Sequence, residues 1–411
     1  MTAFFQDLAW KLQTRWLATG YREASFPSVC AEVLLESEPA RHLDMTSLLR
    51  WGLGADRLPL QIDADASFGE PPLTVFANER FHITLYFWLN GTPDIHDHGF
   101  SGAFTVLKGT SLHTTFRFDP RETVNDHLML GTLTEHGVEL VGRGDVREIQ
   151  ACGATIHSLY HLERPSLSMV VRTHRNVFSR PQYIYSRSGV AWNPSHDRLE
   201  LKRRLQLMKF VRVVEPEELV DHAAKWLEST DAAAAFIGLR GLVASLPMAE
   251  GDELLARIET RLPMVTTLVR GVVENDRREM AITHPRATVS DPELRFFLAV
   301  LVNVHGRETA LRVIQERFPD RDPVESIMVW VRALAQLPSP TGVGPSVLGF
   351  TLTEAVDTSL RSLLQGKDAD AHRQDIEALA GRPLTSSEGH DLLRLRRVLQ
   401  SSMMFRNLIG V

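Results

Sequence analysis

The spacing of apolar residues changes once along the chain, and this change constrains the fold more than any other feature of the sequence. In residues 60–192, apolar and polar residues alternate in short runs that Gly, Pro, Asn and Asp interrupt. Many short strands at this spacing predict an all-β sandwich or barrel. After Pro194 the period lengthens to about 3.6 residues, which predicts helices. The predicted fold class is therefore α+β, with an N-terminal β-barrel followed by an all-α region.

Helical periodicity is also present before the barrel. Apolar side chains of residues 4–17 recur on one helix face, so we expect residues 1–55 to pack as helices on the outside of the barrel. The helices predicted in the second half are residues 217–228, 233–246, 252–262, 292–304, 308–318 and 323–337, with a further helical segment at 351–408. In that last segment Thr353 is a predicted N-cap, and Thr385 and Glu388 are predicted to form a capping box.

The length of the chain indicates more than one domain. A single core rarely grows beyond about 250–300 residues, and the chain has 411. We predict a barrel domain with its N-terminal helices in residues 1–195, a helical domain in 196–340 and a C-terminal helical segment in 341–411. The Pro-rich stretch at 338–345 is the predicted linker.

Composition and charge exclude several classes of protein. The formal net charge of −6 disfavours nucleic acid as a partner. Cys30 and Cys152 are the only cysteines, so the chain has neither a disulfide framework nor a Cys-x-x-Cys metal site. The chain starts without basic residues and meets Asp7 at once, unlike a secretory signal. No stretch approaches the roughly 20 apolar residues that span a bilayer. We therefore expect a cytoplasmic protein with no membrane partner.

Two histidines carry the main chemical signal. His96 and His98 are two residues apart, so on a strand their side chains project from the same face. Two imidazoles on one barrel wall suit a divalent first-row metal and need one or two more ligands. The residues leave open whether His157 or His161 is the third ligand, or whether the first pair simply bonds to backbone and solvent in a turn. Asp97 points to the other face and is predicted to be an acid in a surface turn.

The pattern Gly-x4-His-x-His, followed by Gly-Asp and then Gly-x3-His-x3-His, resembles the two motifs of the cupin superfamily. Over about residues 75–190 it is more similar to the thiol dioxygenase branch, of which cysteine dioxygenase is the type. The His-x-His-x-x-Ser signature of that branch, closed by Leu-Lys-Gly, is matched by His96, His98, Ser101, Leu107 and Gly109. The resemblance implies a double-stranded β-helix barrel that holds one Fe(II) ion per chain through His96, His98 and His157, with His161 beside these ligands.

The return strand departs from the thiol dioxygenases. Those enzymes carry Ser-x-His-x-Tyr where this chain has Ser168, Val170 and Arg172 in the same phase. By this alignment Arg172 faces the metal, where a guanidinium binds a substrate carboxylate bidentately. The alternative is a strand-end arginine paired with an acid such as Glu163.

Further residues are assigned to the site through the resemblance. Trp88, Ser168 and Tyr183 are predicted to bind the substrate together with Arg172, and His161 is predicted to act in catalysis with Arg172. For Tyr183 the alternative is ordinary packing within the sheet.

The resemblance, together with these departures from it, implies a mononuclear non-heme Fe(II) oxygenase that oxidises a small thiol or amino-acid-like substrate with O₂. One alternative is a non-catalytic metal- or ligand-binding cupin whose helical half binds a protein partner. Another is cupin chemistry with a different metal and without O₂, such as isomerisation or lyase action. The helical half contains no ligand cluster in its sequence and is expected to cap the barrel, to form a homodimer or to bind a protein. Its basic residues 202–204 are predicted to be a solvated helix face.

Overall fold

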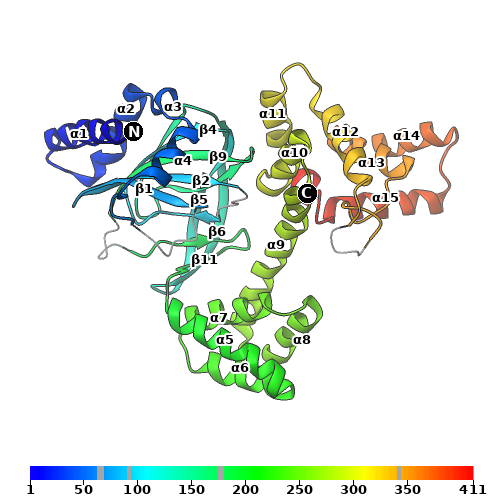
Figure 1. The fold of residues 1–411 in the computed structure, drawn as a ribbon. Helices are drawn as coiled ribbons and strands as arrows, with labels where there is room; N and C mark the ends of the chain where they lie inside the picture. The colour runs from blue at the N-terminus through cyan, green and yellow to red at the C-terminus, as the bar shows by residue number, and fades with distance from the viewer. Residues whose placement is uncertain (63–68, 90–93, 175–179, 340–343, 411) are drawn as a thin grey trace.

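The computed structural model describes residues 1–62, 69–89, 94–174, 180–339 and 344–410. Figure 1 shows a β half in blue to green, a lobe of green helices below it and a group of yellow to red helices beside it. The predicted fold class is confirmed, because an N-terminal β region is followed by a helical C-terminal half. Among the described helices, none has the length and apolar character needed to cross a membrane.

The described strands form two sheets. They are β1 (Pro72–Ala77), β2 (Phe81–Trp88), β3 (Ile95–His96), β4 (Gly102–Lys108), β5 (Ser111–Asn125), β6 (Leu128–Val141), β7 (Val146–Ile149), β8 (Ile156–His161), β9 (Ser166–Thr173), β10 (Ile184–Tyr185) and β11 (Val190–Trp192). The first sheet has the order β1-β2-β9-β4-β7, and the second has the order β10-β11-β6-β5-β8-β3, closed by pairing of β3 with β10. Strands β2, β4, β7 and β9 thus face β3, β5, β6 and β8, which is the double-sheet jelly roll that cupins share.

Alternation along each strand sends side chains into two environments, since successive side chains point to opposite faces of a sheet. In β2, Ile83 and Leu85 belong to the buried cluster under the N-terminal helices. Tyr86 and Trp88 of the same strand belong to a different cluster, which includes residues of β4 and β6 and has Leu159 of β8 packed against it, so it lies between the two sheets. The inner face of the jelly roll is the one that carries the candidate site.

The N-terminal helices cover the outer face of the first sheet, as their periodicity predicts (Figure 1). They are α1 (Thr2–Ala18), η1 (Glu23–Ser25), α2 (Phe26–Ser37), α3 (Pro39–His42) and α4 (Met45–Gly54). Leu8 and Leu12 of α1 lie in one buried cluster with Met169 and Val171 of β9. This packing leaves the alternate residues of β9, among them Ser168, to face the interior.

The helical half contains every helix that the sequence predicts, with bounds that differ by a few residues. Its elements are α5 (Arg198–Val214), η2 (Pro216–Glu218), α6 (Leu219–Glu228), α7 (Ala232–Ala244), α8 (Met248–Ile258), α9 (Pro263–Thr288), α10 (Pro292–Asn303), α11 (Arg307–Arg317), α12 (Pro323–Ala335), α13 (Glu354–Leu364), α14 (Ala369–Ala380), α15 (Ser386–Ser401) and α16 (Arg406–Ile409). Helix α9 is an addition that periodicity did not predict. A polar run at 274–279 interrupts its apolar residues, and Pro285 lies within it.

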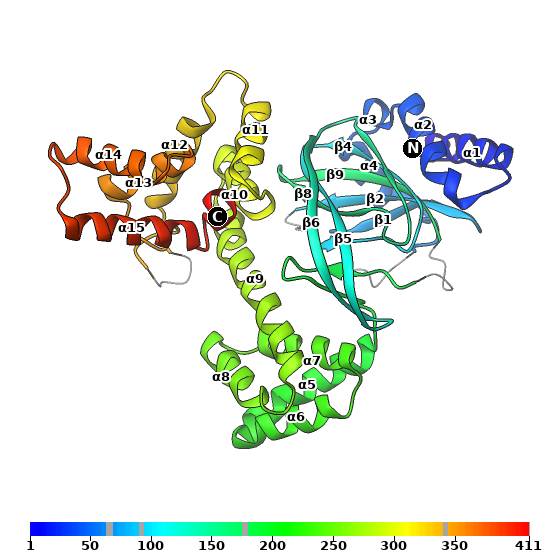
Figure 2. The same ribbon diagram turned by 180° about the vertical axis from the view of Figure 1, so that it is seen from behind.

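Both buried clusters of the helical half include side chains of the β half. The cluster of α5 to α9 includes Trp192 of β11. The cluster of α10 to α16 includes Leu112 of β5 and Tyr160 of β8. Arg286 of α9 lies over the Tyr160 ring, 4.6 Å from its centroid, and donates a hydrogen bond to the backbone oxygen of Leu162 at 3.2 Å. The helical half therefore covers the outer face of the second sheet, as the view from behind in Figure 2 also shows.

Capping in the C-terminal helices agrees with the sequence. The Thr353 side chain accepts a hydrogen bond from the backbone of Val356 at the start of α13. Thr385 and Glu388 form the expected capping box at the start of α15. The predicted division between residues 340 and 341 lies outside the described residues, so it stays a prediction with the other domain boundaries.

Candidate metal centre

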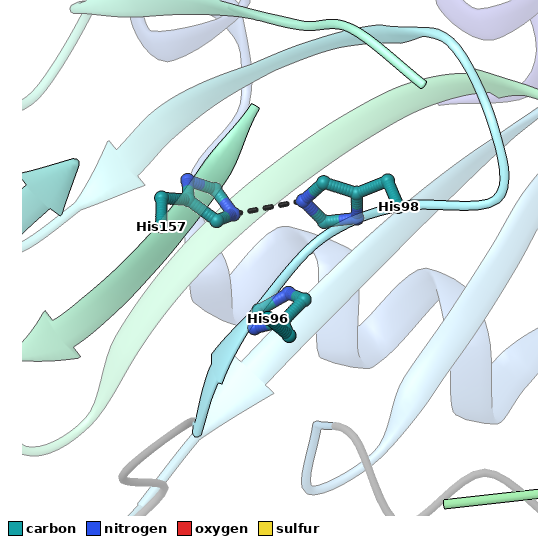
Figure 3. A group of neighbouring side chains, drawn as sticks. All are labelled: His96, His98 and His157. Atoms are coloured by element: carbon teal, nitrogen blue, oxygen red, sulfur yellow. Dashed lines mark hydrogen bonds between the residues drawn. The ribbon is translucent and has the colours of Figure 1, made fainter. Parts of the chain in front are cut away.

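Three histidine side chains converge between the two sheets (Figure 3). His96 on β3 and His157 on β8 are direct partners in the antiparallel pairing of these strands. His98 follows two residues after His96, and the three ring centroids lie 4.7, 4.9 and 5.1 Å apart. Each side chain is no more than 5% exposed. The structure thus brings together the two histidines of the motif and, as the third, His157.

The spacing of the ring nitrogens fits one metal ion. Nε2 of His98 and Nε2 of His157 lie 2.9 Å apart (Figure 3). One nitrogen from each of the three rings lies within 4.8 Å of the others. Two nitrogens that each lie about 2.0–2.1 Å from one ion are about 3 Å apart when they meet at a right angle. His98 and His157 therefore have the spacing of neighbouring ligands on a single ion, and His96 offers a third nitrogen within 4.8 Å of both.

The backbone orients the His96 ring. Nδ1 of His96 lies 2.7 Å from the backbone oxygen of Asp94. We assign the proton to Nδ1, since a carbonyl oxygen only accepts hydrogen bonds. In the neutral ring the lone pair then lies on Nε2, which is the usual arrangement of a ligating histidine.

A chain of hydrogen bonds orients His157 in the same way. Its Nδ1 lies 2.9 Å from Nε2 of His113 on β5, and Nδ1 of His113 lies 2.9 Å from the Glu139 carboxylate. Because the carboxylate only accepts, the neutral form of His113 has its proton on Nδ1, and in that form its Nε2 accepts a hydrogen bond from His157. Arg147 donates two hydrogen bonds to Glu139 at 2.8 and 2.7 Å, and with His113 it lowers the pKa of Glu139 to about 2. With His113 in that form, these hydrogen bonds leave Nε2 of His157 without a proton, as a metal ligand requires.

Burial keeps the three rings neutral. Removal from water lowers the pKa of His96 below its ordinary value and lowers the pKa values of His98 and His157 further. The neighbouring histidines add to the lowered pKa of His98 and His157. Neutral imidazole is the form that binds metals, so these rings need not release a proton before they bind a metal at neutral pH.

His161 belongs to a separate interior cluster. Its Nδ1 lies 3.0 Å from the Ser111 hydroxyl, and its ring stacks on Trp88 with centroids 4.4 Å apart. Nε1 of Trp88 donates a hydrogen bond to the Ser168 hydroxyl at 3.2 Å. Burial lowers the pKa of His161 to about 3. Of the two candidates for the third ligand, His157 is the one that lies with His96, whereas His161, Trp88 and Ser168 lie with one another.

Arg172 is connected to the three histidines through Phe100. Its guanidinium lies 4.4 Å from the centroid of the Phe100 ring, and that ring lies 4.6 Å from the ring of His98. Nε of Arg172 donates a hydrogen bond to Nε2 of His82 at 2.7 Å. Glu163, the alternative partner that the sequence offered, pairs with Arg317 at 3.1 Å. The structure therefore places Arg172 beside the candidate metal centre, while its role in binding stays a prediction.

Tyr183 and Asp97 do not lie where the sequence analysis expected them. Tyr183 was expected to line the substrate site, and Asp97 was expected at the surface. Tyr183 shares a buried cluster with Ile156, which points to the opposite face of β8 from His157. Its hydroxyl donates a hydrogen bond to the backbone oxygen of Asp126 at 2.6 Å, so the packing alternative describes it better. Asp97 is fully buried, which corrects the surface prediction. Its carboxylate accepts from the backbone N–H of Tyr183 at 2.6 Å and pairs with a guanidinium, that of Arg180.

The sequence analysis missed His113, Glu139 and His82, because all three lie outside the recognised motifs. A usable signal was present at the start of β5, where Ser111 and His113 place polar side chains on the inner face of a buried strand. That pattern marks a polar interior. It does not reveal which distant histidine completes the contact.

A scan against protein-family models finds no match, and a search of curated proteins finds none either. Among solved structures the chain is similar to the DMSP lyase DddQ from Ruegeria pomeroyi, with 16% identity, coverage of 45% of this chain and 97% of that chain, and a TM-score of 0.24. An uncharacterised double-stranded β-helix protein from Klebsiella pneumoniae has 12% identity, coverage of 31% and 99%, and a TM-score of 0.20. Hydroquinone 1,2-dioxygenase from a Sphingomonas species has 14% identity, coverage of 28% and 72%, and a TM-score of 0.21.

None of these three proteins is described as a cysteine dioxygenase. TM-scores this low carry no argument about activity. The jelly-roll assignment therefore rests on the strand order of this chain itself.

Proposed function

We propose that this protein is a metal-dependent cupin enzyme. One Fe(II) ion, held by His96, His98 and His157, serves the oxidation of a small thiol or amino-acid-like substrate with O₂. The observation that carries the proposal is the convergence of three buried, neutral imidazoles, of which His98 and His157 have the nitrogen spacing of neighbouring ligands on one ion. The choice of iron, O₂ and a thiol is supported by the resemblance of the His-x-His-x-x-Ser segment to thiol dioxygenases.

A bound Fe(II) ion would supply a place for a substrate heteroatom and O₂ to meet, because three neutral imidazoles leave up to three positions of an octahedral ion open. The protein contributes orientation. The backbone oxygen of Asp94 and the ring of His113 fix two of the imidazoles from behind. The buried rings of Phe100 and Phe104 lie against His98 and His157 and exclude water from that side of the centre.

Arg172 would hold the acid group of the substrate. His82 and the Phe100 ring fix its side chain beside His98. A guanidinium presents paired N–H groups that match a carboxylate, so a bound amino acid or mercapto acid would direct its thiol or amine toward the histidines.

The test uses the full chain, purified without added metal and then loaded anaerobically with Fe(II). We expect about one metal ion per chain by elemental analysis, and O₂ uptake with at least one small thiol or amino acid. We expect His157→Ala to lose both, and His136→Ala to retain both because His136 is an exposed histidine on β6. Absence of metal from the wild-type protein would refute the metal centre. Metal retention without O₂ uptake would refute the oxygenase and favour the binding or O₂-independent alternatives.

The carboxylate assignment has its own test. We expect Arg172→Met to raise the KM of an acidic substrate by about 10- to 100-fold, since a hydrogen bond between charged groups contributes about 1.5–3 kcal/mol. A thiol without a carboxylate should be turned over equally by the two proteins. Equal KM values for the acidic substrate would contradict the assignment.

A further inference from the structure

Two of the three proposed ligands, His96 and His98, lie on one short segment of the chain (Figure 3). Strand β3 consists of Ile95 and His96, so it ends before His98. His96 is held on one side by its pairing with His157 of β8 and on the other by its pairing with Ile184 of β10. The position of His98 therefore depends on how the chain is held beyond the end of this strand.

Asp97, the residue between the two histidines, continues the pairing of β3 with β10 by one residue. Its backbone N–H donates to the backbone oxygen of Tyr183 at 3.2 Å. The return bond uses the side chain, because the backbone N–H of Tyr183 donates to Oδ1 of Asp97 at 2.6 Å. In a regular antiparallel pair the backbone oxygen of Asp97 would accept this bond. The carboxylate takes its place, so the backbone can turn after Asp97 while the N–H of Tyr183 keeps a partner.

The other carboxylate oxygen of Asp97 meets two side chains of the segment that contains β10. The Tyr185 hydroxyl donates to Oδ2 at 2.9 Å, and the Arg180 guanidinium pairs with the same oxygen. Arg180 also donates to the Tyr185 hydroxyl at 3.1 Å, and it lies 5.1 Å from the centroid of the Tyr183 ring. The side chain of Asp97 is fully buried, so its negative charge depends on these donors, since a buried charge without partners is strongly unfavourable.

We propose that Asp97 is a positioning residue for the metal centre, and that Tyr185 and Arg180 act through it. Alternation along the chain sends the side chains of His96 and His98 to the interior and that of Asp97 to the opposite face. By holding Asp97 in place, its donors fix the backbone between the two histidines. They thereby set the separation of the two rings, whose centroids lie 4.7 Å apart.

This role completes the support of the three proposed ligands. The backbone oxygen of Asp94 and the ring of His113 orient the other two. His98 is held through the backbone on both sides, by Asp97 before it and by the N–H of Cys152, which donates to the backbone oxygen of His98 at 2.9 Å. The inference rests on the proposed metal site, and it concerns how tightly and in what geometry that site binds a metal.

The first test measures the affinity of the full chain for Co(II), by competition with a chromophoric chelator. We expect Asp97→Asn to lower this affinity by about 10- to 100-fold, because its side chain keeps one acceptor oxygen for three donors. The matched control is Asp357→Asn. Asp357 also pairs with an arginine, Arg332, at 2.8 Å, but it lies on α13 in the helical half. This variant should keep the wild-type affinity even if its melting temperature falls.

The second test separates positioning from a general loss of stability. The visible absorption spectrum of bound Co(II) depends on its coordination geometry. At saturating metal the spectrum should therefore change in Asp97→Asn and stay unchanged in Asp357→Asn. Tyr185→Phe removes one donor and retains the ring, so we expect a smaller change of the spectrum and a smaller loss of affinity. This variant decides the question if far-UV circular dichroism shows that Asp97→Asn does not fold.

The outcomes distinguish this inference from the proposed function. A wild-type chain that binds no Co(II) would refute the metal centre itself, because nitrogen ligands bind Co(II) at least as tightly as Fe(II). A wild-type chain that binds Co(II), with the same affinity and spectrum in folded Asp97→Asn and Tyr185→Phe, would overturn the positioning role alone. Equal losses of affinity in Asp97→Asn and Asp357→Asn would also overturn it, since metal binding would then follow stability.

Discussion

Nε2 of His113 lies 2.9 Å from Nδ1 of His157, so a fourth buried histidine stands directly behind a proposed metal ligand. Behind His113 lies the Glu139 carboxylate, whose side chain is 43% exposed. The orientation of His157 on β8 is thereby set by residues of β5 and β6. The candidate metal centre is connected through this chain to the surface of the protein.

Replacement of His113 should weaken metal binding without removing a ligand. We expect His113→Phe to lower the metal affinity by about 10- to 100-fold, because Nδ1 of His157 loses the acceptor that fixes its ring. Competition with a chromophoric chelator measures the change. His136→Ala, at an exposed histidine, should leave the affinity unaltered. A folded His113→Phe protein with the metal affinity of the wild type would show that the hydrogen bonds through His113 do not orient His157.

The two histidines of β8 should respond differently to removal. His157→Ala should reduce the metal content from about one ion per chain to nearly none, because the centre loses one of three ligands. His161→Ala should retain the ion and lower the melting temperature, since it leaves a cavity beside Trp88. Elemental analysis and thermal unfolding of the two variants check this. Loss of the ion from His161→Ala with retention in His157→Ala would show that His161, and not His157, is the third ligand.

Acid should destabilise the protein through its buried histidines. The pKa of His161 is about 3 in the folded state because of burial, against about 6.5 in an unfolded chain. Between these values the unfolded state binds more protons, so the free energy of unfolding falls as the pH falls, by about 1.4 kcal/mol per pH unit for one such group. Urea unfolding between neutral and acid pH should give a smaller slope for His161→Gln than for wild type. An equal slope in His161→Gln and in the exposed-site control His136→Gln would contradict this.

Gly102 should not tolerate a side chain. A Cβ atom there would lie 2.0 Å from the backbone oxygen of Val171 and 2.9 Å from Cα of Arg172, its partner in the pairing of β4 with β9. We expect Gly102→Ala to lower the free energy of unfolding by about 2–3 kcal/mol through overpacking. Gly137→Ala is the matched strand control, since its nearest neighbour is Oγ1 of Thr115 at 3.6 Å. Denaturant unfolding of both variants measures the difference, and equal stabilities would contradict this close approach.

Local patterns predicted much of the fold and part of the site. The change of period separated strands from helices, and alternation placed His96 and His98 on one face because a strand repeats every two residues. Helix α9 escaped prediction, since the polar run at 274–279 and Pro285 obscure its periodicity. Its buried face is set by contacts with other elements rather than by a regular local pattern.

Contacts between distant strands were not predictable from local patterns. His113 meets His157 only because β5 pairs with β8 in one antiparallel register, and that register is a property of the whole sheet. Asp97 was expected at the surface because acids usually are, yet the guanidinium of Arg180 and the backbone of Tyr183 compensate its burial. The resemblance to thiol dioxygenases supplied His157, which residue spacing alone left undecided.

The side chains of two adjacent residues of β5 point to opposite faces of the sheet. Leu112 joins the core of the helical half, and His113 stands behind the candidate metal centre. A one-residue deletion at the start of this strand would exchange the faces to which the two side chains point. The imidazole would then face the apolar core of the helical half, and the leucine would face the histidines. The register of this strand is therefore constrained from both sides, by the core of the helical half and by the candidate metal centre. An insertion or deletion there should be selected against, even when the neighbouring residues are unchanged.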